Sequence, residues 1–65
     1  MKLSDIEIQV LILTCNDVSA QSIGDTLCKS KRTIDGYRQS LYKKTNTNGI
    51  AGLVKYALRN NIIEL

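Results

Sequence analysis

Apolar residues recur three or four positions apart in four short segments of this chain, and this spacing restricts the fold more than any other feature of the sequence. Such spacing places apolar side chains on one face of an α-helix. The clearest stripe is that of the last segment, which consists of Ile50, Leu53, Val54, Ala57 and Leu58. The chain contains no Pro that would break a helix. We therefore predict an all-α fold of four helices in one domain, residues 1–65.

Three serines predict where the first three helices begin. Ser4, Ser19 and Ser30 each precede an apolar-periodic segment, where a Ser side chain can accept a hydrogen bond from a backbone N–H of the first turn. Glu7, three residues after Ser4, completes the pattern of a capping box. The first helix is expected to end near Cys15. The second has barely two turns, so it must be held by packing, because isolated helices below about 12 residues are marginal in water.

Turn residues and inward-facing apolar residues complete the predicted frame. Asn16 and Asp17 end the first helix, and Thr45 to Gly49 forms the turn before the last. The inward residues of the first three helices are predicted to be Ile6, Val10, Leu11, Leu13, Ala20, Ile23, Leu27, Ile34, Tyr37, Leu41 and Thr45. Five residues are expected to reverse the chain after the last helix and fold back onto the core: Asn60, Asn61, Ile62, Ile63 and Leu65. For Ile8 and Ile12, off the first stripe, we favour added burial over an exposed interaction patch.

Basic charge is concentrated in one part of the chain. The net charge is +3, but residues 1–27 carry one Lys against four acidic residues, whereas residues 28–44 carry six Lys or Arg against a single Asp. Such clustering is typical of a surface that meets phosphate groups. The predicted third helix lies in this segment, which makes it the candidate for binding nucleic acid.

Several classes of function lack the residues that they need. The longest apolar run, Val10 to Leu13, is far short of the roughly 20 residues that cross a bilayer, and no signal peptide is apparent, so we expect a cytoplasmic protein without membrane contact. The absence of His, of a glycine-rich phosphate loop and of clustered carboxylates argues against an enzyme, a metal site or a cofactor. Cys15 and Cys28 are expected to be buried reduced thiols, with a disulfide as the alternative.

The face of the third helix opposite its apolar stripe is polar and chemically mixed. It is predicted to carry Arg32, Asp35, Gly36, Gln39, Tyr42, Lys43 and Asn46. This mixture suits base reading, because Gln can pair with adenine and Asp can accept from the cytosine amino group, while Arg and Lys hold phosphates. A solvated surface explains the polarity equally well. It explains Gly36 less well, because a Gly inside a helix costs about 1 kcal/mol relative to Ala, which suggests that something approaches the backbone there.

The order of these segments carries a family resemblance. Only Lys29 and Ser30 separate the short second helix from the longer third, and so short a connection is typical of a helix-turn-helix. From Leu3 to Ile63 the chain resembles the LuxR/FixJ (GerE-like) DNA-binding domain found at the C-terminus of bacterial response regulators and quorum-sensing activators. The matching segments are LSDIEIQVLIL, SAQSIGDTL, SKRTIDGYRQSLYKK and AGLVKYALRNNII. The third and fourth are most similar to members from Bacteroidetes.

The resemblance implies a transcription regulator whose third helix, residues 30–45, enters the major groove of double-stranded DNA. Matched position by position, it assigns base reading to Asp35, Gly36 and Gln39. It assigns contacts near the DNA backbone to Lys31, Arg32, Thr33, Arg38 and Lys43. It also implies a homodimer on DNA through the fourth helix, and the candidates for the dimer face lie away from the apolar stripe: Gly52, Lys55, Tyr56 and Arg59.

Three positions depart from the family pattern, and two other functions stay open. Lys29 stands where an apolar residue is usual, Asp17 replaces a common Gly, and Asp35 is acidic where many members are neutral or basic, so the target DNA sequence does not transfer. Region 4 of a bacterial sigma factor is the nearest alternative, and a helical protein-interaction module without DNA contact is another. A receiver domain outside this chain and RNA polymerase are further candidate partners.

Overall fold

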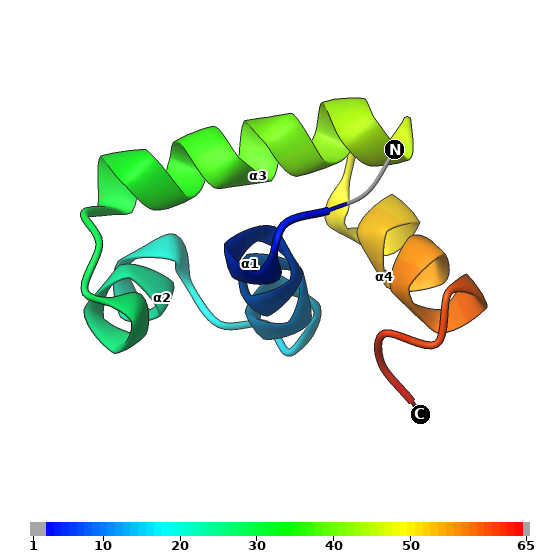
Figure 1. Cartoon of the computed structure of the whole chain (residues 1–65), viewed down its shortest axis with the longest axis horizontal. Coiled ribbons are helices and arrows are strands. Elements are labelled where there is room, and N and C mark those ends of the chain that lie inside the picture. The colour runs from blue at the N-terminus through cyan, green and yellow to red at the C-terminus, as the bar shows by residue number, and fades with distance from the viewer. Residues whose placement is uncertain (1–2, 65) are drawn as a thin grey trace.

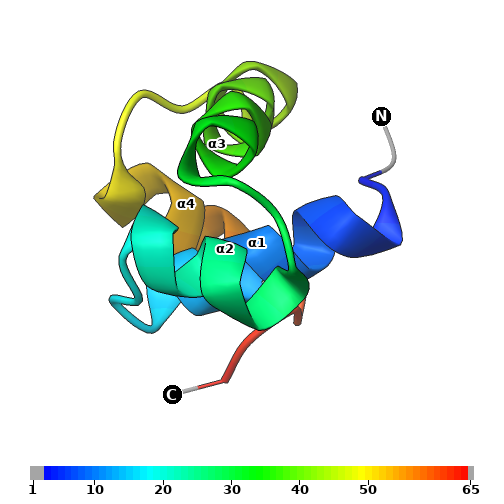
Figure 2. The same cartoon turned by 90° about the vertical axis from the view of Figure 1, so that its left-hand side faces the viewer.

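Four α-helices make up the computed structural model, which describes residues 3–64. They are α1 (Asp5–Cys15), α2 (Ala20–Leu27), α3 (Lys31–Thr45) and α4 (Ile50–Arg59), and the described residues form no strand. The predicted all-α fold of four helices is confirmed. α3 lies along one side of the other three helices, so its far side carries no other helix (Figure 1 and Figure 2). Within residues 3–64, no helix combines the length and the apolar character that crossing a membrane requires.

Local hydrogen bonds fix the start of three helices where the serines predict it. The hydroxyls of Ser4, Ser19 and Ser30 accept from the backbone N–H three residues further on, at 3.3, 3.2 and 3.1 Å. The capping box at Ser4 is complete, because the Glu7 carboxylate accepts from the Ser4 N–H at 2.9 Å. α4 begins after Gly49 without a side-chain cap.

The chain reverses after each helix through a residue in the left-handed backbone region. These residues are Asp17, Cys28, Asn46 and Asn61, with φ angles of 63°, 59°, 56° and 58°. Asn61 is confirmed as a left-handed turn residue, whereas Asn60, with φ of −101°, is the C-cap of α4. The φ at Asp17 explains why Gly is common at this position in the family that the chain resembles, since Gly has no Cβ to be strained there.

The core lies where the four helices meet. It consists of Val10, Leu11, Ala20, Ile23, Ile34, Leu41, Leu53 and Ala57, all of which belong to predicted stripes. Ile62 and Ile63 pack against it after the chain reverses, as predicted, while Leu65 lies outside the described residues. Ile8 and Ile12 are half-buried, so they do not form the exposed patch that was the less favoured alternative.

Three expectations about burial are wrong. Ile50 is 43% exposed, because it is the first residue of α4 and stands almost one turn before the buried Leu53. Tyr42 packs against the core instead of pointing outward, because it follows the buried Ile34 by eight positions and so lies at the edge of the same helical stripe. Cys28 is exposed because it caps α2 in the turn, and Cys15 is only half-buried; both thiols are free.

Candidate nucleic-acid interface

The outer face of α3 presents four exposed residues in one row. Arg32, Gly36, Gln39 and Lys43 follow one another at spacings of four, three and four, which places them on the same side of the helix. We call this row the α3 line. The far side of α3 carries no other helix (Figure 2), and the exposure of all four residues leaves the row open to a large partner. The expected outward orientation is confirmed for these four residues.

Asp35 lies beside this row and is engaged with Lys31. The Lys31 ammonium donates to the Asp35 carboxylate at 3.0 Å, with side chains 59% and 47% exposed. A pair this exposed contributes little to stability, roughly 0.3–0.5 kcal/mol for neighbours on one helix face. Asp35, expected to read bases, and Lys31, expected to contact phosphate, therefore form one ion pair. Either role in DNA binding would require this weak pair to open or to bind DNA as a unit.

The first turn of α3 presents hydroxyl groups. Ser30 Oγ lies 2.9 Å from Thr33 Oγ and accepts from the Thr33 backbone N–H. Both residues are exposed, so a phosphate could reach the Thr33 hydroxyl at the helix N-terminus, where the helix dipole favours an anion. Arg38, a further expected backbone contact, is half-buried on the flank of the α3 line.

Gly36 has open space where a side chain would be. A Cβ built at this position meets no heavy atom within 4 Å, and its φ is not positive. Neither the packing of this domain nor the backbone conformation therefore requires Gly here. The inference that an outside partner approaches the backbone at Gly36 stays a prediction, and no internal contact offers another explanation.

A buried carboxylate ties α3 to the start of α1. Glu7 is 4% exposed and accepts from Ser40 Oγ at 3.0 Å and from Lys44 Nζ at 2.9 Å. Hydrogen bonds from the Ser4 backbone and from Lys44 hold the pKa of Glu7 at about 2. The sequence predicts only the capping role of Glu7, because its bonds to Ser40 and Lys44 cross between helices. The charge of Lys44 is thereby balanced by Glu7, and this ion pair links the end of α3 to the start of α1.

Most of the basic charge on α3 is free to meet an anion. Among the described residues, only Lys31 and Lys44 of the cations between positions 28 and 44 lie within 4.0 Å of a carboxylate. The remaining cations in this segment are Lys29, Arg32, Arg38 and Lys43. Since two of these stand at the ends of the α3 line, the row combines a cation at each end with an accessible backbone and an amide between them.

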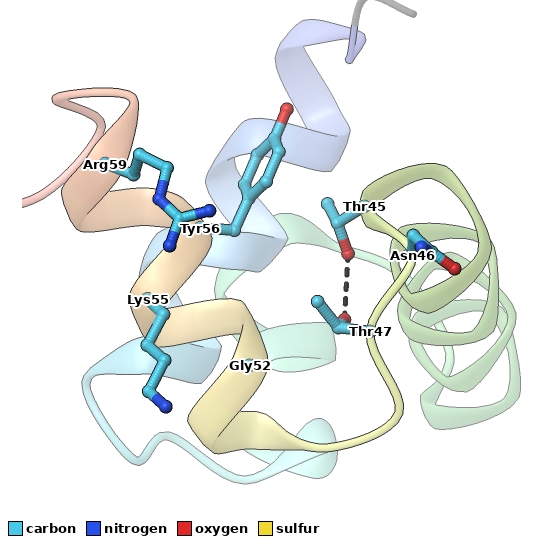
Figure 3. A pocket seen from close by; sticks show the side chains of 7 residues that line it. All are labelled: Thr45, Asn46, Thr47, Gly52, Lys55, Tyr56 and Arg59. Carbon is cyan, nitrogen blue, oxygen red and sulfur yellow. Dashed lines mark hydrogen bonds between the residues drawn. The ribbon is translucent and has the colours of Figure 1, made fainter.

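The four residues expected to form a dimer face come together in a pocket. Gly52, Lys55, Tyr56 and Arg59 line it from α4, and residues 45–47 line it from the end of α3 and the following turn (Figure 3). Gly52 has an internal reason to lack a side chain, because a Cβ there would lie 2.8 Å from Thr47 Cβ. Tyr56 also packs against the core.

Comparison with known proteins identifies similar chains. Residues 1–57 match a family model described as bacterial regulatory proteins, luxR family. The chain is 32% identical over 62 residues to the response regulator GacA of Pseudomonas aeruginosa, which covers 95% of this chain and 29% of GacA. It is 33% identical over 60 residues to BvgA of Bordetella pertussis, named as a transcription regulator of virulence factors, with 92% and 29% covered.

These similarities have limits of coverage and origin. The chain spans less than a third of the length of these relatives. The relatives come from Pseudomonas and Bordetella, so they do not support the expected likeness to Bacteroidetes members. No solved structure matches the chain.

Proposed function

This chain belongs to the luxR family of bacterial regulatory proteins, and we propose that it binds double-stranded DNA sequence-specifically with α3 in the major groove. The observation that carries this proposal is the α3 line, since Arg32, Gly36, Gln39 and Lys43 are all exposed on a helix whose far side carries no other helix (Figure 2). A major groove about 12 Å wide admits one α-helix. The protein would act in the bacterial cytoplasm, where the DNA lies.

Specificity and affinity are assigned to different positions of α3. Gln39 and Asp35 offer groups that can read base edges, and Gly36 lets the helix backbone come close to them. The contacts that are independent of base sequence are assigned to the flanking residues: Lys31, Arg32, Thr33, Arg38 and Lys43. Selection of bound sites from random duplex DNA tests the first group, and salt titration tests the second.

Lys43→Ala is expected to weaken binding to all duplexes and to lower the slope of log affinity against log salt concentration by about one, because one phosphate contact is lost. Gln39→Ala is expected to leave the slope unchanged and to relax base preference at one position. Fluorescence anisotropy over a salt series measures both. Lys55→Ala, which removes the same charge from α4, is the control. An unchanged slope for Lys43→Ala would contradict the phosphate contact.

Gly36→Ala is expected to weaken binding to the selected DNA site by about tenfold, because a methyl group would stand where the DNA approaches the helix. The free domain loses nothing by this change, since the site of the new Cβ is empty. The measurement is the affinity of the variant, checked for unchanged fold by circular dichroism. Equal affinity of variant and parent would show that DNA keeps its distance from Gly36.

A homodimer on DNA through α4 is also proposed, with a different face from the one the sequence favoured. An isologous contact through Lys55 and Arg59 would bring like charges together. The apolar side of α4 avoids this, because Ile50 is exposed and Val54 and Leu58, one and two turns on, are half-buried. Ile50→Glu is expected to abolish pairing on a two-half-site duplex while leaving half-site binding intact.

The relatives suggest the larger setting. GacA is named as a response regulator, so we propose that this chain is the effector domain of such a protein, with a receiver domain elsewhere in it and RNA polymerase as a downstream partner. Selection of bound sites from random duplex DNA is the deciding experiment, because it yields base preference and half-site spacing together. Failure to bind DNA even at low salt would favour an interaction module, and binding only with polymerase would favour a sigma-like role.

A further inference from the structure

A pocket of about 310 Å³ lies between the end of α3 and one side of α4. It is lined by Thr45, Asn46, Thr47, Gly52, Lys55, Tyr56 and Arg59. Figure 3 shows the residues of the α3 end on one wall and the side chains of α4 on the other. The volume is at the small end of the roughly 300–1,000 Å³ of ligand pockets, so it suits a side chain with its adjoining backbone better than a whole cofactor.

The α4 wall carries positive charge, and the described part of the chain places no counter-ion beside it. Lys55 and Arg59 stand four residues apart on one side of α4, where like charges repel each other. Among residues 3–64, no carboxylate lies within 4.0 Å of either, since the ion pairs there join Lys31 to Asp35 and Lys44 to Glu7. An anionic group in this pocket would relieve the repulsion.

On the opposite wall, the hydroxyls of Thr45 and Thr47 can only accept further hydrogen bonds. Thr45 Oγ donates its single hydrogen to the Leu41 carbonyl at 2.7 Å. In its 2.8 Å contact with Thr47 Oγ, Thr45 must therefore accept, so that the hydrogen of Thr47 is used as well. Both hydroxyls then offer only lone pairs, so a ligand that bonds to either of them has to donate.

We propose that this pocket binds an acidic segment of a partner polypeptide, with a carboxylate at Lys55 and Arg59 and a backbone N–H at Thr47. A polypeptide supplies both the anion and the donor. The DNA backbone supplies only acceptors. α4 leads away from α3 (Figure 1). The rise of the helix puts Arg59 roughly 10 Å along its axis from Gly52. The pocket includes no residue of the α3 line, so the proposal can be tested without DNA.

The test uses a short peptide of alternating Glu and Gly with blocked ends, added to the isotope-labelled chain at low ionic strength and followed by NMR. Amide signals of Thr47, Gly52, Lys55 and Arg59 are expected to shift. Lys55→Gln is expected to weaken the affinity for the peptide about threefold, and the double variant with Arg59→Gln is expected to weaken it about tenfold. The matched control Lys29→Gln, at an exposed cation in the turn before α3, is expected to change affinity less than twofold.

Three outcomes would overturn the proposal. The first is a peptide-induced shift of the amide signals of the α3 line instead of those of the pocket, or a loss of peptide affinity that is as large for Lys29→Gln as for Lys55→Gln. The second is that inorganic phosphate binds as tightly as the peptide and that Thr47→Val, which removes the accepting hydroxyl, weakens the binding of neither. The third is that Lys55→Gln lowers the slope of log DNA affinity against log salt concentration, which would assign the pocket to the DNA backbone.

Discussion

Replacing Glu7 with Gln is expected to lower the free energy of unfolding by about 2 kcal/mol at pH 7, because the carboxylate is buried and accepts hydrogen bonds from charged and neutral donors. Gln keeps the shape and one accepting oxygen but loses the charge that meets Lys44 at 2.9 Å. The expected loss depends on pH, and that dependence separates an electrostatic role from simple packing.

The direction of the pH effect follows from the pKa of Glu7. The Ser4 backbone N–H, then Lys44, and then the hydroxyls of Ser40 and Ser4 lower it from 4.5 to about 2, against the opposing effect of burial. A carboxyl whose pKa is lower in the folded state stabilises the fold fully above pH 4.5 and loses this contribution as the pH falls toward 2. The difference between the parent and Glu7→Gln should therefore shrink over this window.

Urea unfolding followed by circular dichroism at several pH values between 7 and 2 measures this difference. Glu64→Gln is the matched control, because Glu64 is exposed and its replacement is expected to change the free energy of unfolding by less than about 0.5 kcal/mol. A difference for Glu7→Gln that stays constant with pH would mean that shape, and not charge, stabilises this position.

Glu7 also illustrates what the sequence could predict about the fold. The three Ser caps are predicted correctly because each bond spans only three residues, and the local pattern contains both partners. The bonds from Glu7 to Ser40 and Lys44 span 33 and 37 residues, and no local pattern indicates them. Burial differs from prediction at Ile50 and Tyr42 for local reasons, because Ile50 is the first residue of α4 and Tyr42 lies at the edge of the apolar stripe of α3.

The candidate site was predictable to a similar extent. Helical periodicity alone places Arg32, Gly36, Gln39 and Lys43 on one exposed face, and the structure agrees. The pairing of Lys31 with Asp35 follows a spacing of four that the sequence displays, so it could have been expected. The pocket beside α4 could not, because it depends on how the turn after α3 lies against Gly52.

Gly24→Ala is expected to destabilise the domain by about 2–3 kcal/mol, although Ala is the better helix former. A Cβ on Gly24 would lie 2.5 Å from the Lys29 carbonyl oxygen, which is backbone and cannot rotate away. The Lys29 N–H also donates to the Gly24 carbonyl at 2.8 Å, so the chain between α2 and α3 lies directly on this residue. The added methyl group has to push that turn away.

The same substitution at Gly36 provides the control. Both glycines lie inside helices, but a Cβ at Gly36 meets nothing within 4 Å, so Gly36→Ala is expected to stabilise the domain by about 1 kcal/mol. Thermal and urea unfolding of the two variants measure the opposite signs. Because the turn after α2 sets the angle at which α3 leaves it, Gly24→Ala should also reduce DNA affinity under conditions where the variant is still folded. Stabilisation by both substitutions would contradict the close contact between α2 and the turn.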